Sequence, residues 1–274
     1  MKKRQAILRI QHAEMAEGPR SESESRWTRR ALLGSLLAGA GCAGTGSSSG
    51  GRGEQVSLER DPWGHRPGPR GFHTVIIDAG HGGSDPGAVS RSTGDREKEL
   101  ALDTANRLQR TLKGDFRTVL MRSSDEFIDL DDRVARANRH EGAILVSIHY
   151  NASPSASVRG PETYFWRVDS HGLATRIQNG LEEVVPVASG NLGLRRRRLR
   201  LTRNPQIPCV LVECGYLSNA SEARLCTQPS YRERLATSMA SAIRDQERLG
   251  DAGTGPKPKP LWQPLSRASD PPGS

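Results

Sequence analysis

Thr74-Val-Ile-Ile-Asp-Ala-Gly-His-Gly-Gly-Ser-Asp-Pro-Gly87 is the stretch that decides the fold of this 274-residue chain. Its apolar first half is typical of a buried β-strand, and the run ends at a histidine set among glycines. Glycine allows tight turns and lets another group approach the backbone closely. We therefore expect His81 at a strand tip, where open α/β sheets place their ligands.

Two later apolar runs also end on residues that carry chemistry. Val146-Ser-Ile-His149 ends one run, and Val210-Leu-Val-Glu213 ends another. A further carboxylate, Glu97, stands just before apolar residues that recur at a helical period, so it is expected in a first helical turn. Histidines and carboxylates that converge at strand ends point to a metal site.

Seven motifs along the chain resemble those of the zinc-dependent N-acetylmuramoyl-L-alanine amidases of bacterial cell walls. They follow the order and spacing of that family over residues 73–248. The motifs are Asp78-Ala-Gly-His-Gly-Gly, Arg96-Glu-Lys-Glu, Arg122-Ser-Ser-Asp, Arg133-Val-Ala-Arg-Ala-Asn138, Ser147-Ile-His-Tyr-Asn-Ala, Pro161-Glu-Thr-Tyr-Phe and Pro208-Cys-Val-Leu-Val-Glu-Cys-Gly-Tyr-Leu-Ser-Asn219. One such motif would be weak evidence, whereas seven in order are very unlikely by coincidence.

The resemblance implies one Zn²⁺ per chain, held by His81, Glu97 and His149, with Glu213 as the catalytic carboxylate. Catalytic zinc commonly takes three protein ligands of this kind and leaves one position for water. Zinc lowers the pKa of that water and polarises the amide carbonyl. Glu213 would carry a proton from the water to the leaving nitrogen.

Several neighbouring residues are alternative metal ligands or could orient the ligands. Glu99 is an alternative to Glu97 as the ligand, although the family pattern favours Glu97. Asp78 and Asp85 flank His81 and are candidates for orienting an imidazole ring through a hydrogen bond.

Substrate contacts are expected near the site as well. Asn151 follows His149 closely, and the basic run Arg195-Arg-Arg-Arg-Leu-Arg200 precedes the strand of Glu213. Arginine forks bind carboxylates bidentately, so Arg198 and Arg200 are candidates for gripping the carboxylates of a wall peptide. A solvated loop explains the same basic run equally well.

Strand-like and helix-like segments alternate along the chain, which predicts an α/β fold. We expect a single domain with a central, mostly parallel or mixed sheet of about six strands and helices on both faces, as the family has. Strands are expected near 73–79, 116–121, 143–149, 161–166 and 207–213, and helices near 97–113, 129–140, 170–184 and 229–248.

Composition divides the chain into four segments. Residues 1–42 resemble an export signal, and the Gly-, Ser-, Arg- and Pro-rich stretch 43–71 is typical of a disordered linker. Residues 72–249 form the expected catalytic domain. Residues 250–274 are rich in proline and are expected to be an unstructured tail.

The expected export signal has a twin-arginine-like motif, Trp27-Thr-Arg-Arg30, before a short apolar core. Cys42 ends a loose lipoprotein box, so membrane attachment through a lipidated Cys42, simple cleavage near Ala43 and an uncleaved anchor are all open. Translation from Met15 would shorten the long charged region in front of the motif. We expect export to the periplasm or cell envelope.

Three further cysteines, Cys209, Cys214 and Cys226, lie in the expected domain. Cys209 and Cys214 flank an expected buried strand and fit the part of small apolar residues. A disulfide to Cys226 is left open, and the metal residues make Cys214 unnecessary as a nucleophile.

The formal charge of +9 is compatible with anionic peptidoglycan as the partner. No nucleic-acid partner is expected, because no nucleic-acid-binding motif accompanies the charge. Two other functions remain open: a non-catalytic peptidoglycan-binding module, and a zinc peptidase or deacetylase of the wall. Only a short stretch separates Phe165 from the helix expected near Ser170, and the loop after Val185 is also short. Neither has room for an inserted helix that would block the active site, so we expect no built-in autoinhibitory helix.

Overall fold

The computed structural model describes residues 68–269 of the chain. The expected export signal, with Cys42, lies outside the described residues, as does the expected linker up to residue 67. Within the described part, no helix combines the length and the apolar character needed to cross a bilayer.

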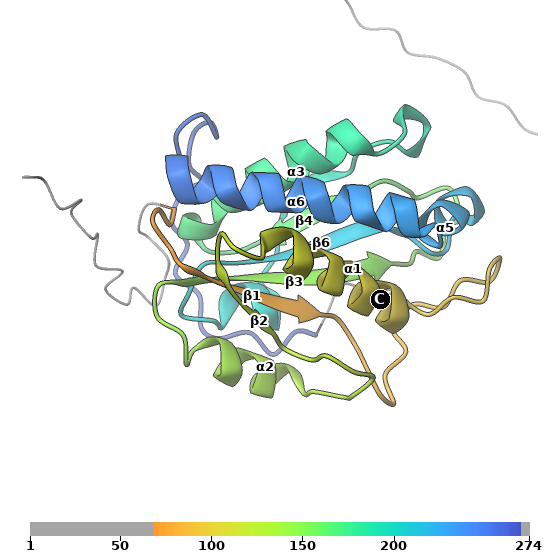
Figure 1. Ribbon diagram of the computed structural model, residues 1–274, viewed down its shortest axis with the longest axis horizontal. Helices are drawn as coiled ribbons and strands as arrows, with labels where there is room; N and C mark the ends of the chain where they lie inside the picture. Colours follow the sequence, from red (N-terminus) through yellow and green to blue (C-terminus); the bar gives the residue numbers. More distant parts are fainter. Residues whose placement is uncertain (1–67, 270–274) are drawn as a thin grey trace, which may run out of the picture. The chain divides into compact units, whose positions relative to one another are not determined.

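A six-stranded sheet forms the centre of the described domain (Figure 1). Its strands are β1 (Thr74–Ala79), β2 (Arg117–Leu120), β3 (Ala143–Asn151), β4 (Glu162–Phe165), β5 (Gly193–Arg196) and β6 (Cys209–Tyr216). They lie in the order β2-β1-β3-β6-β4-β5, and every neighbouring pair is parallel except β4 and β6. This confirms the expected mixed, mostly parallel sheet.

Six α-helices pack around the sheet in the described part of the chain. They are α1 (Glu97–Leu112), α2 (Leu130–Ala137), α3 (His171–Val184), α4 (Arg200–Arg203), α5 (Ala220–Cys226) and α6 (Pro229–Leu249). Side-chain caps fix two of the starts, because Asp129 accepts from the Asp131 amide before α2 and Asn219 accepts from two amides of α5.

The main core lies between one face of the sheet and the helices α1, α3 and α6, which Figure 1 shows side by side. Alternate strand residues such as Val75 and Ile77 point into it and meet Leu108 of α1 and Leu235 of α6. The apolar positions read as helical in the sequence are the buried face of α1.

The opposite face of the sheet is covered by α2 and α4. Ile76 and Leu145 form a small apolar cluster there, near the amino ends of their strands. Polar residues follow on the same face toward the carboxyl ends, namely Asp78, Ser147 and His149. Side chains alternate between the two faces of a strand, so this switch places chemistry on one face at one edge of the sheet.

Strand β5 and helices α4 and α5 were not among the expected elements. β5 runs through the basic stretch, and its four residues Gly193–Arg196 pair only with β4 at the edge of the sheet. Charged residues are common on edge strands because they discourage pairing with other chains. Because β5 is an edge strand mostly of glycine and arginine, its sequence lacks the alternation of apolar and polar residues that predicts a half-buried strand.

The described part of the C-terminal segment, residues 251–269, contains no helix or strand, but it is hydrogen-bonded to the domain. Ser266 and Asn204 exchange two hydrogen bonds, of 2.7 and 3.0 Å. Arg203 donates to the Gln263 carbonyl, and the Arg200 amide donates to the Ala268 carbonyl at 3.0 Å. An extended, proline-rich segment forms no backbone hydrogen bonds within itself, so its carbonyl groups need other donors. Arg200 and Arg203 of α4 donate to some of these carbonyls.

Candidate metal centre

His81, Glu97 and His149 meet at the carboxyl ends of β1 and β3. The distance from Glu97 Oε1 is 3.0 Å to His81 Nε2 and 2.9 Å to His149 Nδ1. One ligand atom from each residue lies within 4.8 Å of the other two, and all three side chains are buried. The ring centroids of the two histidines are 4.9 Å apart, in an edge-on arrangement.

This geometry fits a divalent metal ion. Ligands bound tetrahedrally at about 2.0–2.1 Å from one zinc ion lie about 3.3 Å from each other. The two separations from Glu97 Oε1 are slightly shorter, so a small outward movement of its carboxylate from the two rings would admit the ion. Two imidazoles and one carboxylate are also a donor set that zinc favours.

Hydrogen bonds determine which ring nitrogen of each histidine carries the proton. His81 Nδ1 lies 2.8 Å from a carboxylate oxygen of Asp85, which only accepts, so Nδ1 carries the proton and Nε2 is the nitrogen suited to binding a metal ion. The Ser147 hydroxyl donates to Asp78 at 2.6 Å and therefore accepts from His149 Nε2 at 3.2 Å. That leaves Nδ1 of His149 as the nitrogen suited to binding a metal ion.

Glu97 is the first residue of α1, as expected, and is completely buried. Its two carboxylate oxygens accept the backbone amides of Ala88 at 2.7 Å and Tyr150 at 3.0 Å. These two amide hydrogen bonds stabilise the charged form of the buried carboxylate, so the group is anionic. Glu99 is half-exposed and pairs with Arg96 instead.

The glycines around His81 leave room for the site. A Cβ on Gly80 would lie 2.3 Å from the His149 ring, and one on Gly87 would lie 2.5 Å from a Glu97 carboxylate oxygen. Gly87 has a φ of +63°, and His81 itself has a φ of 58°. A histidine held in the left-handed region is strained, and such strain is retained where surrounding contacts fix it.

Two buried arginines supply those contacts. Arg133 pairs with Asp78 and also donates to the His81 carbonyl at 2.7 Å. Arg122 donates to the Ala79 and Gly80 carbonyls at 2.9 and 2.8 Å. In the sequence these arginines were recognised only as parts of family motifs. That they hold the loop of His81 was not predictable, because the contacts join residues more than 40 positions apart.

Glu213 lies in the β6 strand directly opposite His149 of β3. Neighbouring strands are about 4.8 Å apart, and paired residues of parallel strands share a face. The carboxylate is therefore beside the metal centre, on its α2 and α4 face, and it is completely buried.

The three expected substrate contacts lie in different surroundings. Asn151 is buried, and its amide donates to Glu162 at 3.2 Å. Arg200 lines the pocket in front of the metal centre, whereas Arg198 donates to the Pro264 carbonyl at 3.2 Å. Glu162 was not predicted as a site residue, although it belongs to the Pro161-Glu-Thr-Tyr-Phe motif.

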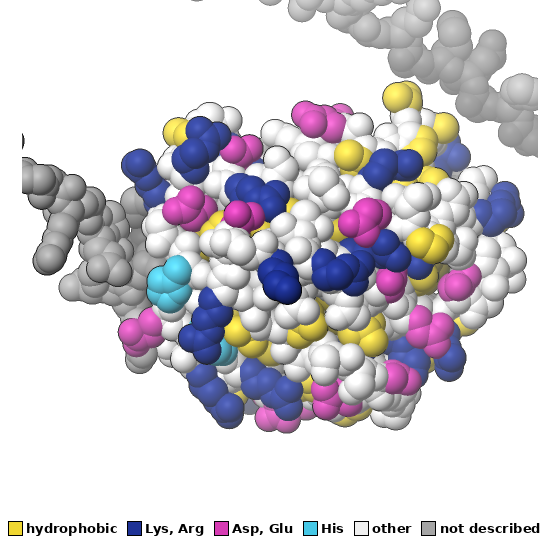
Figure 2. Space-filling view, viewed as in Figure 1, with side chains coloured by type: hydrophobic (Ala, Val, Ile, Leu, Met, Phe, Trp, Pro, Cys, Tyr) yellow, Lys and Arg dark blue, Asp and Glu magenta, His cyan; other side chains and the backbone are white. Residues whose placement is uncertain are grey.

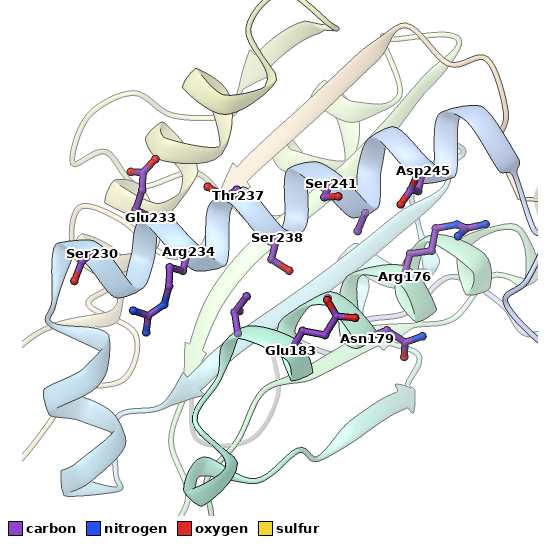
Figure 3. Close-up of a pocket in the computed structure, with 13 residues that line it drawn as sticks. Arg176, Asn179, Glu183, Ser230, Glu233, Arg234, Thr237, Ser238, Ser241 and Asp245 are labelled. Atoms are coloured by element: carbon purple, nitrogen blue, oxygen red, sulfur yellow. The ribbon is translucent and has the colours of Figure 1, made fainter.

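A small cavity of about 190 Å³ opens onto the metal centre. Its walls come from the β1 loop, the segment before α2, the start of α4 and the C-terminal segment, represented by His81, Phe127, Arg200 and Ser269. A larger groove of about 580 Å³ lies between α3 and α6 (Figure 3). It is lined by serines, Glu183, Arg234 and other surface residues, and contains no metal-ligating cluster.

The three cysteines of the described domain are free and buried. Burial raises the pKa of the Cys209 thiol to about 12 and the pKa of Cys214 further still. Both thiols are therefore protonated near neutral pH and unsuited to nucleophilic attack.

Curated relatives share this part of the chain. LytC of Bacillus subtilis, an N-acetylmuramoyl-L-alanine amidase, is 36% identical over 169 residues, which are 60% of this chain and 33% of LytC. LytH of Staphylococcus saprophyticus, a probable cell wall amidase, is 31% identical over 173 residues, which are 62% of this chain and 57% of LytH. The chain thus spans a third of LytC and just over half of LytH.

Solved structures agree with the sequence comparison. An N-acetylmuramoyl-L-alanine amidase from Clostridium difficile 630 is similar with a TM-score of 0.61 at 31% identity, over 64% of this chain and 97% of that one. The catalytic domain of CwlV from Bacillus (Paenibacillus) polymyxa var. colistinus gives 0.58 at 36% identity, over 63% and 97%. The sequence profile of one family matches residues 75–245. Because that match spans more than half of the chain and the metal residues fall within it, the chain belongs to the N-acetylmuramoyl-L-alanine amidase family Amidase_3, a family of hydrolases.

Proposed function

We propose that the chain is a zinc-dependent N-acetylmuramoyl-L-alanine amidase that cuts peptidoglycan between the lactyl group of N-acetylmuramic acid and the L-alanine of the stem peptide. The observation that carries the proposal is the juxtaposition of His81, Glu97 and His149 with the buried Glu213. His81, Glu97 and His149 would hold one zinc ion, which supplies a Lewis acid and lowers the pKa of an attacking water.

Glu213 is proposed as the proton carrier. It takes a proton from the attacking water and delivers it to the amide nitrogen, so that L-alanine leaves as a neutral amine. Its position supports this assignment, because it faces the metal centre from the neighbouring strand. Asp85 is proposed to orient the imidazole of His81 directly. Asp78 is proposed to orient the imidazole of His149 through the Ser147 hydroxyl.

Substrate contacts and location are proposed on the same basis. Arg200 lines the cavity and is proposed to contact the wall polymer, and Arg198 and Asn151 are proposed as further substrate contacts. A cell-wall amidase works outside the cytoplasm, so we propose a location in the cell envelope. Export by residues 1–42 and attachment through a lipidated Cys42 are part of the proposal.

Product analysis tests the proposal. The full chain is incubated with purified peptidoglycan, and the soluble fragments are identified by mass spectrometry. An amidase releases intact stem peptides with a free L-alanine amine. Shortened peptides would instead indicate a peptidase, and loss of acetyl groups would indicate a deacetylase.

A further inference from the structure

Glu162 is a buried carboxylate beside the metal centre that the proposed reaction does not use. It is the first residue of β4 and lies directly opposite Glu213 in the antiparallel β4–β6 pair. Only 3% of its surface is exposed. Buried carboxylates are retained where they are hydrogen-bonded, so the partners of Glu162 show what it holds in place.

One oxygen of Glu162 is fully engaged by the protein. Oε1 accepts the hydroxyls of Tyr164 at 2.7 Å and Tyr216 at 2.5 Å, and the amide of Asn151 at 3.2 Å. Burial and the hydrogen bond to Glu162 both raise the pKa of each tyrosine, so both hydroxyls remain protonated donors. These three donors fix the direction of the other oxygen, Oε2.

Oε2 of Glu162 holds Arg195 of the edge strand β5. The distance to Arg195 Nε is 3.2 Å, and the arginine side chain is 49% exposed. Arg195 pairs with Tyr164 across β4 and β5. Within residues 68–269 its only polar partner is Glu162, so both terminal amino groups of the fork are open to a ligand.

The other arginines of this region each already contact a group of the domain. Arg196 donates to the Lys259 carbonyl at 2.6 Å, Arg198 to Pro264, and Arg200 to the Arg267 carbonyl at 2.9 Å. Arg197 lies over the ring of Tyr164.

On the α1 and α6 face, basic side chains are interspersed with acidic ones (Figure 2). There Arg107 and Arg232 both pair with Asp103. Arg195 therefore differs from these arginines in presenting an oriented and unoccupied fork.

We infer that Arg195 binds a carboxylate of the stem peptide and that Glu162 is the residue that positions it. The inference rests on the proposed function. Adjacent strands are about 4.8 Å apart, so the fork, held by the side chain opposite Glu213, lies about 8–10 Å from Glu213. An extended peptide covers that distance in two or three residues at about 3.3 Å each. The ligand is then a carboxylate two or three residues beyond the scissile amide, bound bidentately.

Matched muropeptide substrates test this inference. One substrate has free stem-peptide carboxylates and the other has the same carboxylates amidated. Arg195→Ala should raise the KM for the free form roughly tenfold with kcat nearly unchanged, since a charge-assisted hydrogen bond is lost from binding. The KM for the amidated form should not change. Arg234→Ala on α6 is the control, because Arg234 stacks on Tyr231 and should change neither substrate's kinetics.

A second variant isolates the positioning residue. Glu162→Gln still accepts from the two tyrosines but no longer accepts from Arg195, so it should reduce the preference for the free form about threefold. The double variant should show no greater loss of preference than Arg195→Ala alone, because both changes remove one interaction. Rescue of the preference by Arg195→Lys should be incomplete.

The outcomes separate this inference from the proposed function. If Arg195→Ala releases stem peptide with the wild-type preference for the free form, the inference is wrong and the amidase assignment stands. If wild-type protein releases no stem peptide from either substrate, the proposed function fails and the inference fails with it.

Discussion

Glu213 and His149 are register partners on neighbouring parallel strands, so the proposed proton carrier and a proposed metal ligand are held by the sheet itself. Rigid strands keep such groups in place more accurately than loops. The other two proposed ligands come from the glycine-rich loop after β1 and from the first turn of α1.

The first prediction concerns Glu213. Glu213→Gln keeps the size of the side chain and removes its ability to accept a proton. We expect at least about a hundredfold fall in kcat with metal content unchanged, since general acid–base catalysis contributes about 10²–10⁴-fold. Steady-state kinetics and elemental analysis of the same sample measure both quantities. Glu183→Gln on α3 is the control, and full turnover by Glu213→Gln would exclude the proposed proton transfer.

The second prediction concerns metal affinity. His81→Ala removes one of the three proposed ligands, so the purified variant should contain little zinc and show no measurable amidase activity. Zinc should raise the melting temperature of the wild-type protein and have little effect on the variant, because binding stabilises only a folded site. His140→Ala, a histidine outside the cluster, should behave like wild type. Equal zinc content in His81→Ala would show that the metal is bound elsewhere.

The third prediction separates backbone strain from crowding at the site. Gly87 and Gly94 both have positive φ angles, but a Cβ on Gly94 meets nothing within 4 Å, whereas one on Gly87 would press on His81 and Glu97. Gly94→Ala should cost about 1–2 kcal/mol of stability and leave zinc binding intact. Gly87→Ala should lose zinc as well. Calorimetry and metal titration of both variants make the comparison, and unchanged zinc affinity in Gly87→Ala would contradict it.

The fourth prediction concerns the pH dependence of stability. Glu222 is buried and accepts the amides of Gly160 and Tyr216. Burial raises its pKa from 4.5 to about 7 in the folded protein, while the unfolded chain titrates near 4.5. The folded state therefore binds more protons between pH 4.5 and 7, and this group's contribution to stability falls as the pH rises through that interval.

Glu222→Gln removes that titration. Relative to wild type, the free energy of unfolding of the variant should increase by on the order of 3 kcal/mol from pH 4.5 to pH 7. Urea unfolding at a series of pH values measures the difference. A difference that stays constant across the interval would mean that folding does not raise the pKa of Glu222.

The sequence predicted much of the fold because the apolar runs are long and regular. β1, β3 and β6 are buried along their whole length, and their sequences show it as continuous apolar stretches. The helix after Glu97 was predicted from its period, and its observed range, Glu97–Leu112, differs from the expected range by one residue. β5 was not predicted, because three of its four residues are glycine or arginine.

The residues of the candidate site were predictable where the neighbouring sequence identifies them. His81 stands out because glycines surround it, and the family motifs located Glu97, His149 and Glu213. The contacts of Glu162 were not predictable in this way. They depend on β4 running antiparallel to β6, which brings the first residue of β4 opposite Glu213. The hydrogen bond from Arg198 to the Pro264 carbonyl was likewise not predictable, because it joins residues more than 60 positions apart in the sequence.

Removing zinc and adding it back tests whether the proposed site depends on the metal. Wild-type protein is stripped with a chelator, and zinc is added back in steps while bound zinc and release of stem peptide from peptidoglycan are measured together. We expect no activity in the stripped protein and full recovery at one zinc per chain, with no recovery in His81→Ala. Undiminished cleavage by protein shown to be free of metal would contradict it.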